Sequence, residues 1–280
     1  MNDSVRKVID RLRSESDGAV SDTPPDLVDD NRLIVFDGTP LRIGDLASRP
    51  LDRKIGDGSE GGGKIFKVRL ARSRALYDAN ALVTQRYGQR GYDTAPMPAE
   101  TDRQLFTFVA YSQGVVVGTV AIRMDEPGTS GLGADDLYAE ELTTLRNAGA
   151  RICEFTRLAV DTETSSKPIL AALFHTAYLF AFRVCRYHCA VIEVNPRHVV
   201  FYRRALSFAI IGPERLNRRV NAPAVLLCVT FDAICEGLEK FAGKPELAAK
   251  THTLFPYGFP PDEEAGVLNR LRSLRSADLV

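Results

Sequence analysis

The sequence predicts an α/β protein whose central sheet is mixed and mostly antiparallel, with helices on both faces. Three observations lead to this prediction. From residue 64 onward, strand-like and helix-like segments alternate in the order β-α-β-β-α-β-α-β-α-β. Two of the strands are consecutive and joined by a short turn, which makes an antiparallel hairpin. The later strands alternate with helices, as in βα units packed on a sheet.

Apolar spacing defines the elements of the first half. Residues 73–92 carry apolar side chains at helical spacing, and this helix is expected to end near Gly91. Ser-Gln-Gly at 112–114 is typical of the tight turn of a hairpin. The other elements expected here are strands at 64–71, 105–111, 115–123 and 150–160, and a helix at 134–147.

The second half continues the alternation. Residues 168–187 form the strongest amphipathic pattern, and Pro168 suits the first turn of a helix. Residues 189–194 are a short apolar run that predicts a buried strand. The remaining elements are helices at 198–206, 232–242 and near 262–275, and strands at 207–212 and 222–231.

The first 63 residues differ in composition from the rest. A short helical pattern at 5–12 precedes an Asp- and Pro-rich stretch, a short strand candidate at 33–36 and a Gly-rich linker at 56–63. The sequence therefore predicts three parts: a partly disordered N-terminal extension at 1–63, a main α/β domain at 64–245 and a C-terminal arm at 246–280.

Overall composition excludes several classes of protein. The 36 basic and 36 acidic residues cancel, whereas a protein that coats nucleic acid needs a positive surplus. The five cysteines are odd in number and lack zinc-ribbon spacing, so neither a disulfide framework nor a metal site is expected. The N-terminus has no secretory signal and no segment is long and apolar enough to span a bilayer, so a cytoplasmic location is expected.

The most specific segment is 191–227. A strand ends at Asn195, a helix with Phe201 and Tyr202 follows, and a turn, a strand and a glycine complete the order. This order resembles the last motif of the Gcn5-related N-acetyltransferase (GNAT) superfamily and implies a GNAT-like sheet. In that motif a tyrosine protonates the leaving thiolate, and Tyr202 matches it. Packing between sheet and helix is the alternative role for Tyr202.

Further pieces narrow the resemblance to one family. Taken in order across 65–231, they are similar to N-acyl amino acid synthases of the FeeM type, relatives of acyl-homoserine lactone synthases. The pieces are FKVRLA with RYGQRGY, GTVAIRM, CEFTRLAV, VNPRHVVFYRRALSF and RVNAPAVLL. The resemblance implies an enzyme of lipid signalling that moves a long-chain acyl group from the phosphopantetheine of acyl carrier protein to an amino acid. It implies no further cofactor, and it leaves peripheral contact with a membrane open.

Glu154 is the candidate base. An amine must lose a proton to attack a thioester, and a Glu inside an apolar strand is costly unless it is paired or functional. Glu154-Phe155-Thr156-Arg157 matches the Glu-x-(Ser/Thr)-Arg pattern of lactone synthases, which implies that Glu154 is the base, directly or through a water. Strand alternation places Thr156, a candidate substrate contact, beside Glu154, with Arg157 opposite unless a bulge intervenes. A structural Glu–Arg pair is the alternative.

Arg86 and Arg123 match arginines of the same family, and with Arg157 they are the candidate substrate-binding residues. A guanidinium fork suits the carboxylate of an amino acid. The sequence does not choose among the three arginines, and the helix dipole also explains a cation at Arg86.

Asn195 and Tyr202 are expected near the phosphopantetheine channel. His198 follows Pro196 and Arg197 near the expected cleft and is a candidate substrate contact that could shuttle a proton. A position at a helix N-terminus explains His198 equally well.

Two observations favour carrier protein over CoA as the donor. Acetyl-CoA enzymes of the GNAT class hold the pyrophosphate in a glycine loop, and residues 161–174 contain no glycine. Residues 186–219 carry seven basic and two acidic side chains, so their net charge is 7 − 2 = +5, which suits an acidic carrier protein. A solvated helix face is the alternative. The expected docking residues are Arg197, Arg203, Arg204, Arg218 and Arg219.

Two other functions stay open. One is a CoA-dependent GNAT N-acetyltransferase that acts on a small amine, and the other is a non-catalytic lipid- or protein-binding module with the same fold. If the protein does transfer a long acyl chain, it needs an apolar tunnel. Helix 168–187 and the aromatic-rich segment 254–259 are the expected walls or lid of that tunnel.

Overall fold

A computed structural model of the chain describes residues 3–14, 34–35, 66–92, 102–129, 131–161 and 167–278. The strands are β1 (Ile34–Val35), β2 (Lys67–Leu70), β3 (Leu105–Ser112), β4 (Val115–Met124), β5 (Ile152–Val160), β6 (Cys189–Val194), β7 (Ala209–Ile210), β8 (Arg215–Asn217) and β9 (Ala222–Thr230). The helices are α1 (Asp3–Ser14), α2 (Arg74–Gly88), α3 (Asp135–Asn147), α4 (Lys167–Tyr178), α5 (Val199–Leu206), α6 (Phe231–Phe241), α7 (Ala248–Thr251) and α8 (Pro261–Asp278).

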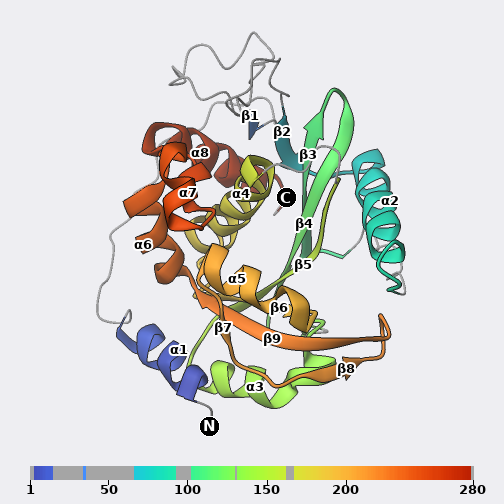
Figure 1. Cartoon of the computed structure of the whole chain (residues 1–280), viewed down its shortest axis with the longest axis vertical. Helices are drawn as coiled ribbons and strands as arrows, with labels where there is room; N and C mark the ends of the chain where they lie inside the picture. Colours follow the sequence, from blue (N-terminus) through green and yellow to red (C-terminus); the bar gives the residue numbers. More distant parts are fainter. Residues whose placement is uncertain are drawn as a thin grey trace.

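The described strands make one mixed sheet with helices on both faces (Figure 1). Their order is β1-β2-β3-β4-β5-β6-β9-β7, and β8 pairs with β9. Each neighbouring pair is antiparallel except β5 and β6, which are parallel. The predicted fold class is therefore confirmed.

Local sequence explains how several elements begin and turn. In the β3–β4 hairpin both Gln113 and Gly114 have positive φ, which a type I′ turn requires and which Gly adopts without strain. Asn195 accepts a hydrogen bond from the backbone of Arg197, and Pro196 opens the short 3₁₀ helix that leads into α5. The Thr230 hydroxyl caps α6 in the same way.

Most predicted elements are confirmed within one to three residues, and the differences are local. The helix predicted at 168–187 is α4 followed by a π-helix at Leu179–Val184. The strand predicted at 207–212 shrinks to the two residues of β7. The three-residue strand β8 and the one-turn helix α7 had no counterpart in the prediction, because elements this short show no period.

Strand alternation divides the core into two layers. Cys153 and Phe155 of β5 point to the layer that holds α4, α6 and α8, whereas Ile152 points to the layer that holds α3 and α1. On β6, Ala190 points to the layer of α4, α6 and α8, and Val191 points to the layer of α3 and α1. Glu154 follows the parity of Ile152 and therefore faces α3.

The sheet opens where β5 and β6 part. Their parallel pairing covers only Ile152–Glu154 and Cys189–Val191. Beyond Glu154, β5 pairs with β4 alone, and there Thr119 opposes Ala159 while Ala121 opposes Thr156. Two residues of β5 thus oppose one of β4, which is a β-bulge. The opening and the bulge lie side by side along β5.

Both ends of the described chain pack on the sheet layers. Helix α1 buries Val5, Val8, Ile9 and Leu12 against α3, β7 and β9. At the other end, α8 packs on the π-helix. The boundaries at residues 63 and 245 stay predictions, and the linker predicted at 56–63 lies outside the described residues. In the described part of the chain, no helix is long and apolar enough to cross a membrane.

Candidate active site

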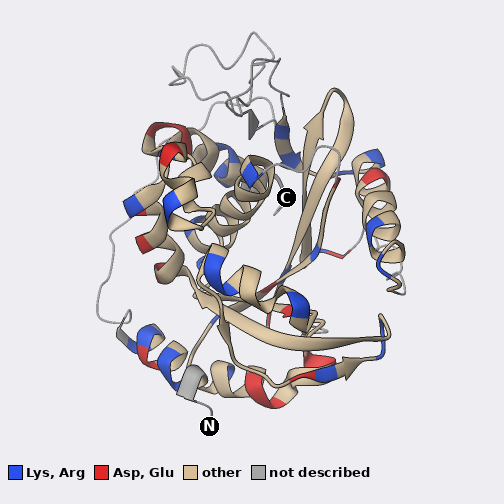
Figure 2. Ribbon diagram, viewed as in Figure 1, with Lys and Arg blue, Asp and Glu red and all other residues tan. Residues whose placement is uncertain are grey.

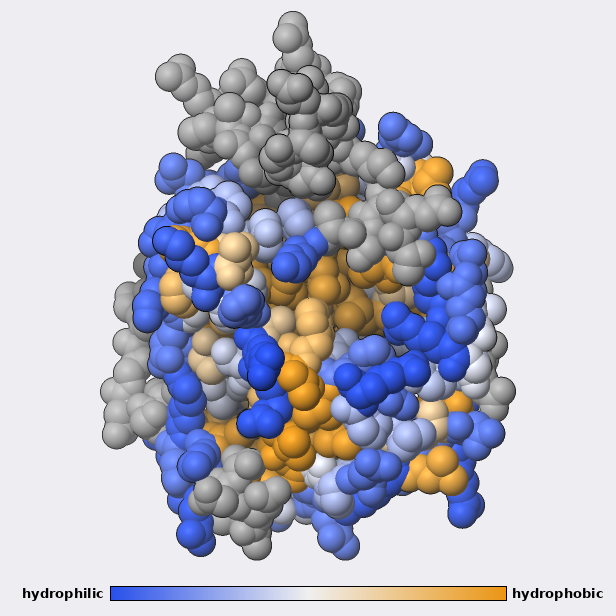
Figure 3. Space-filling view, in the orientation of Figure 1, coloured by the Kyte–Doolittle hydropathy of each residue, from blue (hydrophilic) through white to orange (hydrophobic). Residues whose placement is uncertain are grey.

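A cavity of about 630 Å³ occupies the opening between β5 and β6. Residues of α2, α3, α5 and the β8–β9 hairpin complete its wall. On the face shown in Figure 3, apolar atoms form a hollowed band through the middle, between hydrophilic rims. Eight residues singled out from the sequence line the cavity: Arg123, Glu154, Thr156, Arg157, Asn195, His198, Tyr202 and Arg219.

Glu154 lies at an enclosed point of this cavity and is 4% exposed. Its Oε2 accepts hydrogen bonds from the backbone N–H of Gly133 at 2.6 Å and of Ala134 at 3.3 Å, at the N-terminus of α3. Burial raises the pKa of Glu154, and these two donors and Arg219 oppose that rise. The result is a carboxyl group with a raised pKa in a cavity, which is suited to proton transfer.

The β-bulge brings Arg157 to the cavity as well. Arg157 has a φ of +53°, and Thr156, Arg157 and Leu158 are all lining residues. Strict alternation would have turned Arg157 away from Glu154, so the bulge is what joins them in one wall. The Arg157 guanidinium donates a hydrogen bond to Oδ1 of Asn80 on α2.

The other two candidate arginines have different places. Arg123 lines the cavity at the end of β4, where its Nη2 lies 2.8 Å from a carboxylate oxygen of Asp102. Arg86 does not reach the cavity lining. It forms an ion pair with Asp161 and donates to Gln89 at 2.8 Å, so the structure does not bring it to Glu154.

Tyr202 comes to the cavity from α5 and packs edge-on to Phe174 of α4, with 6.3 Å between ring centroids. Burial raises the pKa of the Tyr202 hydroxyl, so this group holds its proton at neutral pH. It can therefore donate that proton to a leaving group.

The turn before α5 forms part of the rim. Asn195 donates through Nδ2 to the carbonyl of Pro223 at 3.3 Å and so ties this turn to β9. Nε2 of His198 accepts a hydrogen bond from Arg197 at 3.2 Å, and Arg197 also donates to the hydroxyl of Tyr92 at 2.7 Å. Burial and the charges of Arg90 and Arg197 lower the pKa of His198, so its ring is neutral at pH 7.

Glu193 lines the same cavity and was not among the predicted site residues. It lies on β6 and pairs with Arg219, whose Nε is also 3.6 Å from Asp136. Burial, the largest cause, raises the pKa of Glu193 to about 7. The signal in the sequence was the one that singled out Glu154: an acid inside an apolar strand.

The predicted docking arginines divide into two groups. Arg203 and Arg204 are exposed on α5, next to Val200 and Phe201, which are 55% and 40% exposed. Figure 2 shows basic positions on the ribbon of α5. Arg218 is exposed as well. Arg197 and Arg219 are exposed too, but they have partners at the cavity, namely Tyr92 with His198, and Glu193 with Asp136.

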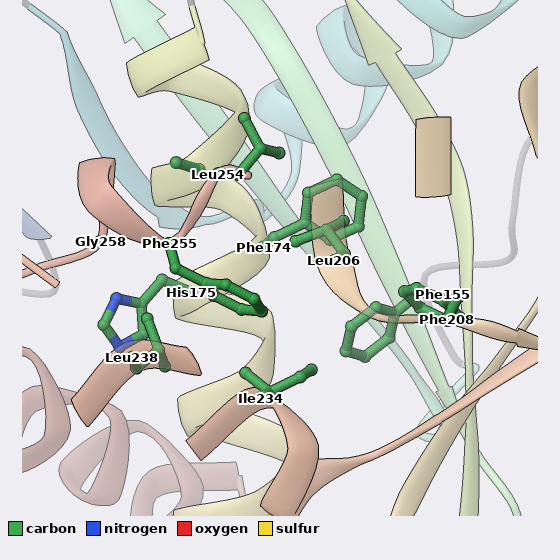
Figure 4. Close-up of a pocket in the computed structure, with 11 residues that line it drawn as sticks. Phe155, Phe174, His175, Leu206, Phe208, Ile234, Leu238, Leu254, Phe255 and Gly258 are labelled. Carbon is green, nitrogen blue, oxygen red and sulfur yellow. The ribbon is translucent and has the colours of Figure 1, made fainter. Parts of the chain in front are cut away.

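A second, apolar cavity of about 20 Å³ lies in the layer of α4 and α6 (Figure 4). Its walls come from α4, α6 and segment 254–259, together with Phe155 of β5 and Phe208. Phe155 and Phe174 line both cavities, so the polar cavity and the apolar one meet at these two rings.

Comparison with known proteins shows the family of the chain. The family model of the N-acyl amino acid synthase FeeM matches residues 78–230, which is more than half of the chain. No curated protein matches the chain. The structure of FeeM from uncultured soil microbes is 26% identical with a TM-score of 0.54, and the match covers 60% of this chain and 93% of that one.

Two further solved structures are more distant. The acyl-homoserine lactone (AHL) synthase LasI is 16% identical with a TM-score of 0.45, over 60% of this chain and 91% of LasI. An acetyltransferase of the GNAT family from Streptococcus pneumoniae is 14% identical with a TM-score of 0.43, over 59% and 98% of the two chains.

Proposed function

Because this chain belongs to the FeeM family of N-acyl amino acid synthases and is an N-acyltransferase, we propose that it acylates an amino acid in the cavity between β5 and β6. The donor is a long-chain acyl group carried by acyl carrier protein. The observation that carries the proposal is the buried Glu154 carboxylate in a cavity that meets an apolar one at Phe155 and Phe174.

The reaction replaces a C–S bond with a C–N bond and needs two proton transfers. The neutral amine attacks the thioester carbon, the new C–N bond forms, and the C–S bond breaks. Glu154 takes the proton that the nitrogen loses, and the Tyr202 hydroxyl gives a proton to the departing sulfur. The proton held by Glu154 then restores Tyr202, so the products are an amide and a free thiol. The raised pKa of Glu154 makes it a stronger base, and the Tyr202 hydroxyl keeps its proton at neutral pH and so has one to give.

Charged groups of the cavity support the binding of an amino acid. Arg123 and Arg157 line the wall beside Thr156, and a guanidinium binds a carboxylate in a bidentate manner. In the proposed complex these arginines hold the acceptor carboxylate. Its amine then points toward Glu154.

The surface of α5 supports a carrier-protein donor. Arg203 and Arg204 are exposed on the helix that brings Tyr202 to the cavity, and Val200 and Phe201 add exposed apolar area. Acidic carrier proteins fit a basic face of this kind. The glycine-free segment 161–174 also favours this donor over CoA, although residues 162–166 lie outside the described residues.

The acyl chain passes between Phe155 and Phe174 into the apolar cavity. That cavity has room for about one water-sized probe, so a long chain must displace side chains as it enters. Segment 254–259 supplies Leu254, Phe255 and Gly258 to the wall (Figure 4) and is the part of the wall expected to shift.

The proposal is tested by a choice of donors. The purified protein is incubated with the twenty amino acids and either palmitoyl-loaded acyl carrier protein or palmitoyl-CoA, and products are measured by mass spectrometry. We expect an N-palmitoyl amino acid from the carrier protein and at least about tenfold less from CoA. Faster reaction with CoA would make the protein a CoA-dependent acyltransferase, and the absence of product from both donors would contradict the proposal altogether.

A further inference from the structure

The cavity contains a second, half-buried carboxylate on the same face of the sheet as Glu154. Glu154 pairs with Val191 of β6, and Glu193 lies two residues beyond Val191. Since side chains at i and i+2 of a strand share a face, Glu193 and Glu154 both point toward α3. Both line the cavity, at the place where β5 and β6 separate.

The two carboxylates have different surroundings. Oε2 of Glu154 is held by two backbone N–H groups, and the residue is 4% exposed. Oε2 of Glu193 pairs with Arg219, while the Asn217 amide lies 3.5 Å from Oε1 and 3.4 Å from Oε2, too far for strong hydrogen bonds. The Glu193 side chain is 11% exposed, so it reaches the solvent of the cavity.

An amino acid acceptor brings a proton that must leave the site. Its amine is an ammonium group at neutral pH, and only the neutral amine attacks a thioester. The net reaction therefore releases one proton to water, in addition to the proton passed between nitrogen and sulfur. A residue that serves this step has to reach both the amine and solvent, which favours Glu193 over the enclosed Glu154.

We propose that Glu193 is a second catalytic carboxylate, which takes the first proton from the ammonium group of the acceptor and releases it to cavity water. The inference rests on the proposed function. In this first step a proton passes from nitrogen to a Glu193 oxygen, which leaves a neutral amine and a neutral Glu193. Release of that proton to water restores the carboxylate. Glu154 then takes the second proton of the nitrogen as the C–N bond forms.

The electrostatics of the site support this role. The groups around Glu193 are Arg219, with Asn217, from the β8–β9 hairpin, Glu154 from β5, and Asp136 and Tyr138 from α3. Burial and the neighbouring acids raise its pKa to about 7, and Arg219 only partly offsets them. A base works best when its pKa lies near the working pH, whereas an ordinary carboxylate is a weak base for an ammonium group.

The test compares nucleophiles that do and do not need this step. Glu193→Gln is assayed with palmitoyl-loaded acyl carrier protein and either an equimolar mixture of the twenty amino acids or hydroxylamine, which is largely neutral at pH 7. We expect kcat/KM at pH 7 to fall by about 10²–10⁴-fold with the amino acids. With hydroxylamine the loss is expected to be less than about tenfold, because no ammonium proton has to be removed.

The pH profile gives a second readout. Wild-type kcat/KM with the amino acids should rise with pH up to about 7 and then level. In Glu193→Gln it should keep rising toward the pKa of the amine itself, and Glu193→Asp should restore part of the rate and the break near pH 7. The exposed Glu214→Gln serves as a matched control and should match wild type in both assays.

Three results would overturn the inference. If Glu193→Gln keeps the wild-type rate and the break near pH 7, Glu193 has no catalytic role and the proposed function still stands. An equal loss with both nucleophiles, in a variant whose melting temperature is unchanged, would assign Glu193 a positioning role instead. If wild type makes no N-acyl product at all, the proposed function fails, and the role of Glu193 fails with it.

Discussion

Single residues decide the chemistry because the fold removes their charges from water. Glu154 and Glu193 each lie between two apolar residues of a strand, and burial raises the pKa of each. Their partners differ: backbone N–H groups hold Glu154, and Arg219 holds Glu193. This difference assigns them to different proton transfers within one reaction.

Glu193 makes the stability of the protein depend on pH. Its pKa is raised to about 7 in the folded protein from about 4.5 in the unfolded chain, so the fold favours the protonated form. This contribution is complete below pH 4.5 and is lost as pH rises through 7. Glu193→Gln keeps the neutral form at all pH values. At pH 8 it should unfold with a free energy higher than wild type by an amount of the order of 3 kcal/mol.

Denaturant unfolding at pH 4 and pH 8 measures this difference. The two proteins should be nearly equal at pH 4, and the exposed Glu214→Gln should match wild type at both values. A stability difference that is the same at pH 4 and pH 8 would show that the pKa of Glu193 is not raised.

Residue identities were only partly predictable from the sequence. Glu154 and Tyr202 were found by motif, and both line the cavity. Glu193 was not found, although it lies in an apolar strand like Glu154 and within segment 191–227, because the resemblance assigned no role to its position. Arg86 matched a family arginine, yet its α2 position directs it to Asp161. Which arginine reaches a cavity depends on packing between elements, and that is not encoded in local spacing.

At the scale of elements, the start of α3 holds the site together. A Cβ on Gly133 would lie 2.8 Å from Nη1 of Arg219 and 3.2 Å from Oε2 of Glu154. The backbone of Gly133 suits any residue, so Gly133→Ala should fold and push both side chains aside. We expect kcat/KM to fall by about 10- to 100-fold with little change in stability.

The matched control is Gly266→Ala in α8, where a Cβ meets nothing within 4 Å. It should keep full activity in the same palmitoyl-transfer assay. Wild-type activity in Gly133→Ala would mean that the distance between α3 and Glu154 is unimportant for the reaction.

The α6 helix and segment 254–259 set the size of the apolar cavity. Leu238 lines that cavity, so Leu238→Ala should shift the product toward longer acyl chains when donors of several lengths compete. Leu145→Ala removes another buried leucine, one that lines neither cavity. Both changes should cost about 2–5 kcal/mol of stability. An unchanged chain-length profile in Leu238→Ala would mean that the acyl chain binds elsewhere.

Elements were more predictable than residues because apolar period and turn chemistry act locally. The β3–β4 hairpin follows from Gln113 and Gly114, and α5 from the Asn195-Pro196 start. From the sequence, a bulge at Arg157 could only be named as the condition for this side chain to share a wall with Glu154. Whether the bulge forms depends on how β4 and β5 align. The extent of the β5–β6 opening likewise depends on the whole sheet.

At the scale of the whole molecule, the balanced net charge covers an uneven surface. The exposed Arg203 and Arg204 of α5 lie beside the cavity residue Tyr202. Arg203→Glu with Arg204→Glu should raise KM for the loaded carrier protein by about tenfold at low salt, and less at high salt. The kcat value should change little, because neither arginine lines the cavity.

The control for this surface is a pair of basic residues on α1 that are neighbours in the sequence and are also exposed. Arg6→Glu with Lys7→Glu should leave KM for the carrier protein unchanged. An equal rise of KM in both double variants would show that only the overall charge of the protein matters. No rise of KM in either variant would exclude α5 as the docking face.

The central claim is that the chain makes N-acyl amino acids with Glu154 as base. It is tested most directly by mass spectrometry of lipid extracts from cells that express either wild type or Glu154→Gln at equal levels. We predict new N-acyl amino acid species with wild type, reduced by about 10²-fold or more in the variant. Equal amounts of these species in the two extracts, or none with wild type, would contradict the claim.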